Sequence, residues 1–337
     1  MNSKVSIYDI ANYLGISAAT VSYVINGVDK VSPKTKERVL KAIEELQYVP
    51  NYTARALSTG KSHLIGLLLP LEDASIAFLQ NPFYSEFIGG LEKGLQGYNY
   101  DLVIGASKSV ENFKEWIQSR DLDALIVIGF HSDKMRLELN DIKIPTVLID
   151  DHSKNLEGFN TVKSDDYKGT YLATKYLIEC NHKNIGFVGS PTNYLIDKIR
   201  YDGYTQAMQE AGLEVLEDNI IDCDATYQAG YDVAFQIMAN KEITALVTTG
   251  DMLAIGIMNH LLEKGYKIPG DISIVGYDDI LNSQVAFPPL TTIHQHITKK
   301  GVSAAKGIIK FLEEDKKEPF DLVLTPYLVE RKSVRKL

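Results

Sequence analysis

The sequence is poor in cysteine and has no long apolar stretch. Cys180 and Cys223 are the two cysteines among 337 residues, too few for a disulfide framework, so we expect idle thiols in a reducing compartment. No apolar run is long enough to span a membrane, and the polar N-terminus lacks the pattern of a signal peptide. These absences predict a cytoplasmic protein without membrane contact, and they weigh against a periplasmic sugar-binding protein.

The signatures of an enzyme or a metal protein are also missing. No Gly-x-Gly-x-x-Gly motif follows the apolar run at 64–69, and no nucleophile–base set is evident. The spacing of four histidines fits no metal motif, and satisfied surface histidines are more common: His131, His152, His294 and His296. We therefore predict no catalytic residues, no metal and no cofactor.

The net charge of −9 is divided unevenly along the chain. Residues 1–61 contain eight Lys or Arg and five Asp or Glu, a balance of +3, whereas the remainder has a balance of −12. A balance of +3 also suits an ordinary solvated surface. Together with the motif described next it favours DNA, and the acidic remainder would repel phosphates, so we expect DNA contact only near the N-terminus.

The first part of the chain has the pattern of a helix-turn-helix. Ser6 followed by Asp9 predicts a capping box, and Ser17 can cap the second helix. Gly15 stands where the tight turn needs a positive φ. The predicted core, with the small Ala11 where the helices cross, comprises Ile7, Ile10, Leu14, Ile16, Val21 and Val24. A third helix is predicted from Ser32-Pro33, with apolar residues at helical spacing: Val39, Leu40, Ile43 and Leu46.

These motifs, in this order, resemble the lactose-repressor family of bacterial transcription regulators. The resemblance is carried by Val5-Ser-Ile-Tyr-Asp-Ile-Ala11, Ala19-Thr-Val-Ser22, Val24-Ile-Asn-Gly27, Val31-Ser-Pro-Lys-Thr35, Tyr48-Val-Pro-Asn51 and Ala54-Arg-Ala-Leu57. It continues through Asn81-Pro-Phe-Tyr84, Gly186-Phe-Val-Gly189, Arg200, Gly203-Tyr204, Gly276-Tyr-Asp-Asp279 and Pro289-Leu-Thr-Thr-Ile293, so it covers nearly the whole chain.

From residue 62 onward, short apolar runs alternate with amphipathic helical stretches, which predicts βαβ units and parallel sheets. The apolar runs are Leu64–Leu69, Leu102–Gly105, Leu125–Ile128, Thr146–Ile149, Ile185–Val188, Ala245–Thr248 and Ile272–Val275. The helical patterns include Phe83–Leu95, Tyr167–Ile178, Arg200–Ala211 and Met252–Leu262. These are more elements than one sheet usually holds, so two lobes are expected.

The expected fold class is a small all-α helix-turn-helix head joined to an α/β core of two Rossmann-like lobes, similar to type I periplasmic binding proteins. The head would span 1–50, the hinge helix and linker 51–61, and the effector-binding and dimerisation core 62–337. The resemblance implies chain crossings near Thr161, Leu290 and Pro326. Lobe one would then take about 62–161 and 291–325, and lobe two about 162–290 and 326–337. No heptad tail is present, which favours a dimer over the coiled-coil tetramer of some relatives.

The second helix of such a head enters the major groove of DNA. The family most often has an arginine where this chain has Tyr23, so bidentate arginine–guanine contact is not available there. Ala18 and Ala19 can make only apolar contacts, and the serine hydroxyls suit phosphates as well as bases. The predicted DNA contacts of the head are Ser6, Tyr8, Ser17, Ala18, Ala19, Thr20, Ser22, Tyr23 and Asn26.

The resemblance implies a further DNA contact, a short hinge helix that includes Asn51, Ala54, Arg55 and Leu57. Such a helix is too short to persist alone in water, so it would fold only when two copies pair over the minor groove. Leu57 would then wedge between base steps and bend the DNA, and packing on the core is the alternative for this side chain. A change in lobe spacing that separates the two copies would melt both helices.

The effector site is expected in the cleft between the lobes, outside the carboxyl ends of the parallel strands. Arg200 and Asp278 match positions that hold ligand in the family, and Asp150 closes another strand. Phe83 and Tyr84 offer aromatic faces, with core packing as the alternative. Carboxylates, a guanidinium and an aromatic platform suit a polyhydroxylated ring, whereas an Arg200–Asp278 ion pair across the cleft is the competing interpretation.

Two departures from the family pattern concern this site. Gly250 stands where relatives usually carry an asparagine or serine that bonds the ligand, and Ala225 replaces an aromatic residue that stacks on some ligands, although Tyr227 can substitute. The pocket therefore differs in detail from those of the purine and lactose regulators.

We predict a sequence-specific transcription regulator, not an enzyme, that binds palindromic double-stranded operator DNA as a homodimer. The resemblance indicates a repressor of a carbohydrate-utilisation operon, released from its operator by a small sugar or sugar phosphate. The alternatives are a catabolite-type global regulator controlled by a phosphorylated carrier protein and a repressor that depends on a corepressor.

Overall fold

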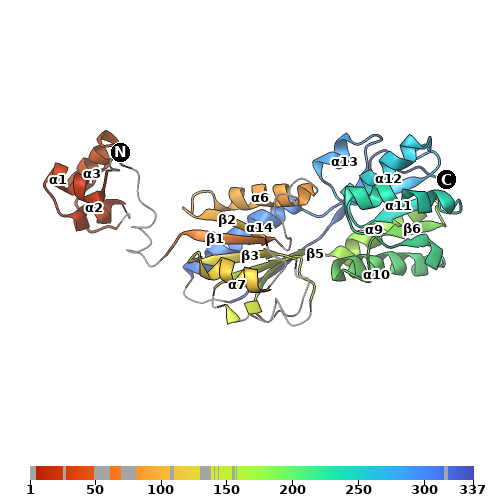
Figure 1. The fold of residues 1–337 in the computed structure, drawn as a ribbon, viewed down its shortest axis with the longest axis horizontal. Helices are drawn as coiled ribbons and strands as arrows, with labels where there is room; N and C mark the ends of the chain where they lie inside the picture. Colours follow the sequence, from red (N-terminus) through yellow and green to blue (C-terminus); the bar gives the residue numbers. More distant parts are fainter. Residues whose placement is uncertain are drawn as a thin grey trace. The chain divides into compact units, whose positions relative to one another are not determined.

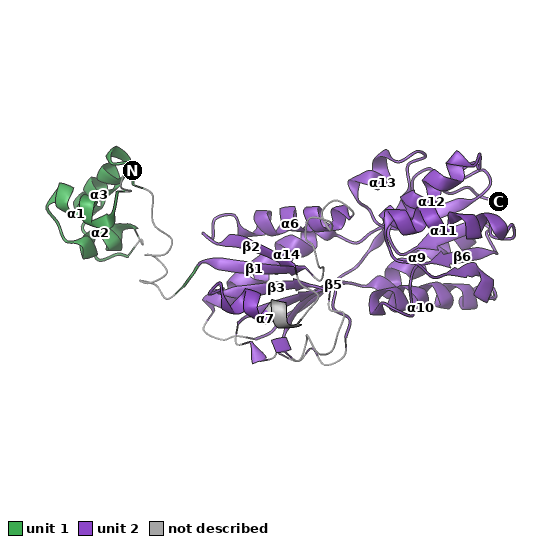
Figure 2. Cartoon of the chain, in the orientation of Figure 1, with its two compact units in different colours: residues 1–62 green, residues 63–337 purple. Residues whose placement is uncertain are grey.

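The computed structural model describes residues 5–25, 28–48, 61–69, 81–106, 110–129, 138–139, 141–142, 144–153, 156, 158–314 and 318–337, with only the backbone of 110–113. The chain forms two compact units, residues 1–62 and 63–337 (Figure 2). Among the described residues, no helix has the length and hydropathy of a membrane span. Several residues discussed above lie outside the described part: Asn26, Asn51, Ala54, Arg55, Leu57 and His131.

The described part of the first unit contains three helices, α1 (Ile7–Leu14), α2 (Ala18–Ile25) and α3 (Pro33–Glu45). The backbone N–H of Asp9 donates to the Ser6 hydroxyl at 3.3 Å, and the Ser6 N–H donates to the Asp9 carboxylate at 2.8 Å. Gly15 ends α1 with a φ of 66°. The capping box and the left-handed turn residue of the predicted helix-turn-helix are therefore confirmed.

The three helices enclose one apolar cluster. Ile10, Val21, Val24 and Val39 are buried in it, and Ile7, Leu14, Ile16, Ile43 and Leu46 pack against it. The prediction for Leu40 is wrong, because its side chain is 50% exposed and Ala42 takes the buried position. Residues 39, 42, 43 and 46 share one face of a helix, whereas residue 40 is turned about 100° away from residue 39.

The described strands of the second unit form two six-stranded sheets (Figure 1). The first has the order β11 (Asp321–Leu324), β5 (Asn160–Ser164), β4 (Thr146–Ile149), β3 (Ala124–Ile128), β1 (Leu64–Leu69), β2 (Asp101–Ala106). The second has the order β12 (Tyr327–Val329), β10 (Thr291–His294), β9 (Ser273–Asp278), β8 (Ala245–Thr248), β6 (Ile185–Val188), β7 (Ile220–Ile221). All pairings are parallel except that of β12 with β10.

Lobe one is the first sheet with helices on both faces. Successive residues of β1 point to opposite faces, so that Ile65 and Leu67 pack with α6 (Pro82–Leu95) and α14 (Ile297–Glu313). Leu68 packs with Ile117 of α7 (Val110–Gln118) on the other face. Burial on both faces explains why β1 is apolar throughout and does not alternate with polar residues.

Lobe two repeats this arrangement around the second sheet. Helices α9 (Asp166–Glu179) and α10 (Leu195–Glu210) cover one face, and α11 (Tyr227–Ala239) and α12 (Asp251–Glu263) cover the other (Figure 1). A 3₁₀ turn (Glu217–Asn219) precedes β7, and α13 (Leu281–Val285) follows β9. The predicted fold class, a helix-turn-helix head with two Rossmann-like α/β lobes, is confirmed.

The chain passes between the lobes in three described segments: after Ser164, at residues 295–296, and at residues 325–326. The first two differ from the expected crossings at Thr161 and Leu290, because β5 pairs with β4 in lobe one and β10 pairs with β9 in lobe two. Both strands are polar and short, and hydrogen bonds satisfy their buried side chains. Ser164 donates to the Gln295 carbonyl at 2.8 Å, which joins the first two segments.

Helices α6 and α14 approach closely through facing glycines. A Cβ added at Gly90 would lie 2.3 Å from the carbonyl oxygen of Thr298, whereas one added at Gly89 would have no atom within 4 Å. Gly90→Ala should therefore lower the free energy of unfolding by about 1–3 kcal/mol through overpacking. Gly89→Ala should leave it unchanged or raise it by about 0.5–1 kcal/mol, because alanine is the better helix former. Urea unfolding measures both, and equal effects would contradict this packing.

Candidate functional site

A buried lysine joins α14 to the carboxyl end of β4. The Lys300 ammonium is fully buried and donates to both oxygens of Asp150 at 2.7 Å and to the Gln295 side-chain oxygen at 2.5 Å. These contacts use all three of its donors. Asp150 also accepts the Ser164 N–H at 3.2 Å. The predicted site residue Asp150 therefore neutralises a buried cation.

A second buried ion pair joins the first residue of α9 to the second turn of α10. The Arg200 Nε and Nη2 atoms donate to one oxygen of Asp166 at 2.9 and 2.7 Å, and Nη1 donates to the Thr249 carbonyl at 2.5 Å. The guanidinium carbon lies 3.8 Å from the ring centre of Tyr277, a close cation–π contact. Burial alone would raise the pKa of Asp166, but Arg200 and His152 hold it well below its usual value.

Arg200 therefore forms its ion pair with Asp166, and not with Asp278 as the competing interpretation had it. Asp278 ends β9, is 8% exposed, and accepts a hydrogen bond from the Gln295 side-chain amide. Burial raises the pKa of Asp278 to about 7, although Arg200, Gln295 and Lys300 favour its ionised form. The buried carboxyl of Asp251, which opens α12, has a strongly raised pKa because of burial and the neighbouring Asp278 charge.

Tyr84 of α6 packs against the apolar cluster of lobe one. Burial, followed by the charge of Asp278, raises the pKa of its phenol to about 12. Phe83 lies in the apolar cluster of lobe one together with Ile280 of lobe two, so we assign Phe83 to the core. A Cβ at Gly250 would lie 3.7 Å from an Asp278 oxygen and 3.7 Å from the Ala225 Cβ. Glycine therefore leaves space beside Asp278.

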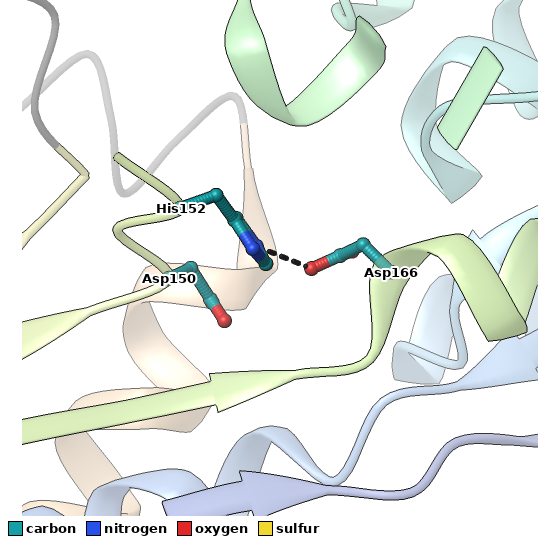
Figure 3. A group of neighbouring side chains, drawn as sticks. All are labelled: Asp150, His152 and Asp166. Carbon is teal, nitrogen blue, oxygen red and sulfur yellow. Dashed lines mark hydrogen bonds and ion pairs between the residues drawn. The ribbon is translucent and has the colours of Figure 1, made fainter. Parts of the chain in front are cut away.

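The group Asp150, His152 and Asp166 has the residue types of a metal site (Figure 3). One ligand atom from each lies within 4.8 Å of the others, and His152 Nε2 contacts Asp166 Oδ2 at 2.8 Å. Both carboxylates, however, already neutralise Lys300 and Arg200. We therefore assign the group to an ion network, in which His152 of lobe one contacts the first helix of lobe two.

Lobe two carries further carboxylates at the same sheet edge. The Ser190 N–H donates to Asp197 at 2.8 Å and its hydroxyl donates to Asp222 at 2.5 Å. The Tyr194 hydroxyl donates to Asp224 at 3.0 Å. Since β6, β7, β8 and β9 are parallel, the loops after them meet at one edge, where ligands of such sheets bind.

Several of these residues were not predicted from the sequence: Asp166, Asp197, Asp251, Tyr277, Gln295 and Lys300. Two signals exist in hindsight. Asp166 and Asp251 are aspartates at helix starts shortly after strands. Lys300 falls on the buried stripe of α14 with Ile297 and Ala304, where a lysine needs a buried partner.

The head presents a mixed polar and aromatic surface. Tyr8 is 67% exposed and Tyr23 is 39% exposed, with the Lys30 ammonium 5.7 Å from the centre of the Tyr23 ring. Ser17 accepts the Thr20 N–H at 3.1 Å and contacts the Thr20 hydroxyl at 2.8 Å, so it caps α2 as predicted. Ala19 is exposed, whereas Ala18 packs partly against the head core and Ser22 is partly buried.

A helix-turn-helix head and a two-lobed core with charged residues at its strand ends define a ligand-responsive DNA-binding regulator. Residues 6–51 match the model of the bacterial regulatory proteins of the lacI family. Residues 62–332 match the model described as periplasmic binding proteins and sugar binding domain of the LacI family. The chain belongs to the LacI family and is a DNA-binding transcriptional repressor.

The chain is similar to known relatives and to solved structures over nearly its full length. The chain is 32% identical to the HTH-type transcriptional repressor PurR of Pasteurella multocida over 98% of each chain. It is 33% identical to PurR of Haemophilus influenzae (strain PittEE) over 98% of this chain and 99% of that one. The lac repressor dimer bound to operator and the anti-inducer ONPF superposes with a TM-score of 0.85, at 25% identity, covering 99% of this chain and all of that chain.

Two further structures contain sugars. A complex of the transcriptional regulator CelR with cellobiose has a TM-score of 0.75 at 27% identity, covering 98% of this chain and 100% of that one. A LacI family regulator from Enterococcus faecium with bound ribose has a TM-score of 0.72 at 27% identity, covering 81% and 99%.

The buried Lys300–Asp150 pair gives a stability prediction. Lys300→Met leaves a buried carboxylate without its cation and should lower the free energy of unfolding by about 3–5 kcal/mol. Lys310→Met, on the same helix, removes an exposed partner of Glu314 at 3.6 Å and should cost at most about 1 kcal/mol. Urea unfolding separates the two. A similar small loss in both variants would show that the buried pair contributes little to stability.

Proposed function

We propose that this repressor binds a palindromic operator as a homodimer and controls a carbohydrate-utilisation operon. A small carbohydrate would bind where the carboxyl ends of the strands of both lobes meet, and its binding would release the operator. The observation that carries this proposal is the buried Asp278 carboxyl of lobe two, whose hydrogen-bond donor Gln295 also accepts a hydrogen bond from Lys300 of lobe one. A ligand that contacts Asp278 therefore responds to the spacing of the lobes.

The chemistry of the site favours a ligand rich in hydroxyl groups. Carboxylates accept hydrogen bonds from sugar hydroxyls, and a phenol both donates and accepts. Gly250 has no side chain, so it adds no bulk beside Asp278. The match to a sugar-binding domain and the related structures with cellobiose and ribose support this ligand class.

To release the operator, the ligand needs only a modest preference for the arrangement of the lobes that does not bind DNA. A tenfold loss of operator affinity corresponds to about 1.4 kcal/mol of coupling between the two sites. Gln295 lies in a segment that connects the lobes. It accepts a hydrogen bond from Lys300 of α14 and donates one to Asp278 of β9, so a change at Asp278 can reach lobe one through a single side chain. A ligand hydroxyl that replaces the Gln295 amide on Asp278 would alter the contact between lobes.

The dimer proposal has a surface to support it. Leu281, Val285 and Phe287 are 67%, 73% and 84% exposed on α13 and the loop after it. Large apolar side chains grouped in this way mark an interaction surface. The related lac repressor is a dimer, so we propose a second copy of this chain as the partner of this surface.

Phe287→Asp should weaken the dimer, because it places a charge in an apolar interface. We expect sedimentation at micromolar concentration to show monomers, and operator affinity to fall at least about tenfold, or 1.4 kcal/mol, because two heads must bind together. Phe235→Asp, at a side chain 60% exposed on α11, is the matched control and should remain dimeric. A dimeric Phe287→Asp variant with normal operator binding would contradict the assignment.

The effector proposal is tested at Asp278. Operator sequences are first selected from random DNA, and sugars are then screened for release of the bound operator. Asp278→Asn should reduce the affinity for an active sugar at least about tenfold, so that the sugar changes the operator affinity of this variant much less than that of the native protein. Tightened operator binding by sugars would identify them as corepressors, and no response to any sugar would contradict the carbohydrate proposal.

The same variant gives a pH prediction. The ionised Asp278 accepts hydrogen bonds from sugar hydroxyls, and its pKa of about 7 means that the ionised fraction grows as the pH rises through neutrality. Sugar affinity of the native protein should therefore increase from about pH 6 to pH 8, measured by calorimetry. Asp278→Asn should lose this dependence, and an equal dependence in both proteins would assign the titration to another group.

A further inference from the structure

The second helix of the head has no charged residue of its own. The sequence of α2 contains no Lys, Arg, Asp or Glu. Val21 and Val24 are buried in the head core, whereas Ala19 and Tyr23 are exposed. Because Ala19 and Tyr23 are four residues apart, they lie on the same face of the helix. In a helix-turn-helix this helix enters the major groove and contacts the base edges. A charged contact to a base beside this face must therefore come from a neighbouring segment.

Lys30 places a cation beside this face. Its ammonium nitrogen lies 5.7 Å from the centre of the Tyr23 ring, within the distance of about 6 Å at which an aromatic ring attracts a cation. A cation–π contact uses no hydrogen-bond acceptor, so the ammonium can still donate to a base. The Tyr23 ring therefore favours positions of the flexible lysine side chain that are close to the helix that reads DNA.

The backbone of Lys30 is held at the end of the same helix. The Val28 N–H donates to the Tyr23 carbonyl at 2.9 Å, and the Lys30 N–H donates to the Val28 carbonyl at 2.8 Å. On the other side, Val31 packs against the head core and Ser32 caps α3. These contacts fix the position from which the Lys30 side chain extends relative to α2.

A guanine is the base that suits this ammonium. In the major groove guanine presents two acceptors, N7 and O6, which lysine and arginine contact. A phosphate also accepts from lysine but carries no sequence information, and the ammonium is held beside the helix that faces the bases. We propose that Lys30 is a specificity-determining residue that donates to a guanine of the operator, and that Tyr23 positions it. The proposal concerns the DNA-binding activity and does not depend on the effector.

Binding of the full-length protein to DNA tests this role. An operator is selected from random DNA with the native protein, and each of its base pairs is then replaced in turn. Fluorescence anisotropy should show that Lys30→Met binds the selected operator at least about tenfold more weakly and loses the preference for G·C at one position. Lys30→Arg should keep this preference, because arginine donates to the same two acceptors.

Lys41→Met is the matched control, because it removes the same charge from an exposed lysine of the same head. It should leave the preference at every position unchanged. If Lys30→Met weakened binding to all sequences alike and reduced the salt dependence by about one counterion, Lys30 would contact a phosphate and the proposal would be overturned. Unchanged operator binding by Lys30→Met would overturn it as well.

A double-mutant cycle tests the role of Tyr23. Tyr23→Leu removes the ring that holds the ammonium, so in this background Lys30→Met should weaken operator binding less than about threefold, against at least about tenfold when the ring is present. Lys41→Met should have the same effect in both backgrounds. An equal loss from Lys30→Met with and without the ring would show that Tyr23 does not position the ammonium.

Discussion

The buried ion pairs Asp166–Arg200 and Asp150–Lys300 constrain the region where the two lobes meet. A charge removed from water is costly unless a partner and further hydrogen bonds compensate it. Here each cation has one dedicated carboxylate, and each donates a further hydrogen bond, Arg200 to a backbone carbonyl and Lys300 to a side-chain amide oxygen. The pairs also fix the ends of the elements that carry them, since Asp166 opens α9 and Asp150 follows β4. Other contacts between the lobes depend on this arrangement.

Two of the contacts between the lobes in the described part of the chain are directional hydrogen bonds. His152 of lobe one reaches Asp166 of lobe two, and Gln295 joins Lys300 to Asp278. Each is a hydrogen bond that a ligand hydroxyl can replace at little net cost, because one hydrogen bond is exchanged for another. The apolar contact of Ile280 with the lobe-one cluster is different, because burial of apolar surface holds the lobes together without requiring a particular bond direction. Exchangeable polar contacts beside a fixed apolar one support the proposal that a ligand changes the spacing of the lobes.

Apolar strands and capped helices were predictable from the sequence, whereas polar strands and buried charges were not. The run Leu64–Leu69 corresponds to β1 residue for residue, and the capping box at Ser6 forms as predicted. Strands β5 and β10 were missed because their buried threonines and asparagine resemble loop residues until their partners are known. For the same reason, Arg200 was identified without Asp166, its partner 34 positions away. The hinge residues of the family pattern remain predictions.

The charge of the chain is divided unequally between the head and the core. The balance of +3 in residues 1–61 against −12 in the remainder means that phosphates are attracted to the head and repelled elsewhere. Because DNA is a polyanion, its attraction to this chain must come from the head. The acidic core therefore disfavours contact with DNA outside the head, which restricts how the chain can bind an operator.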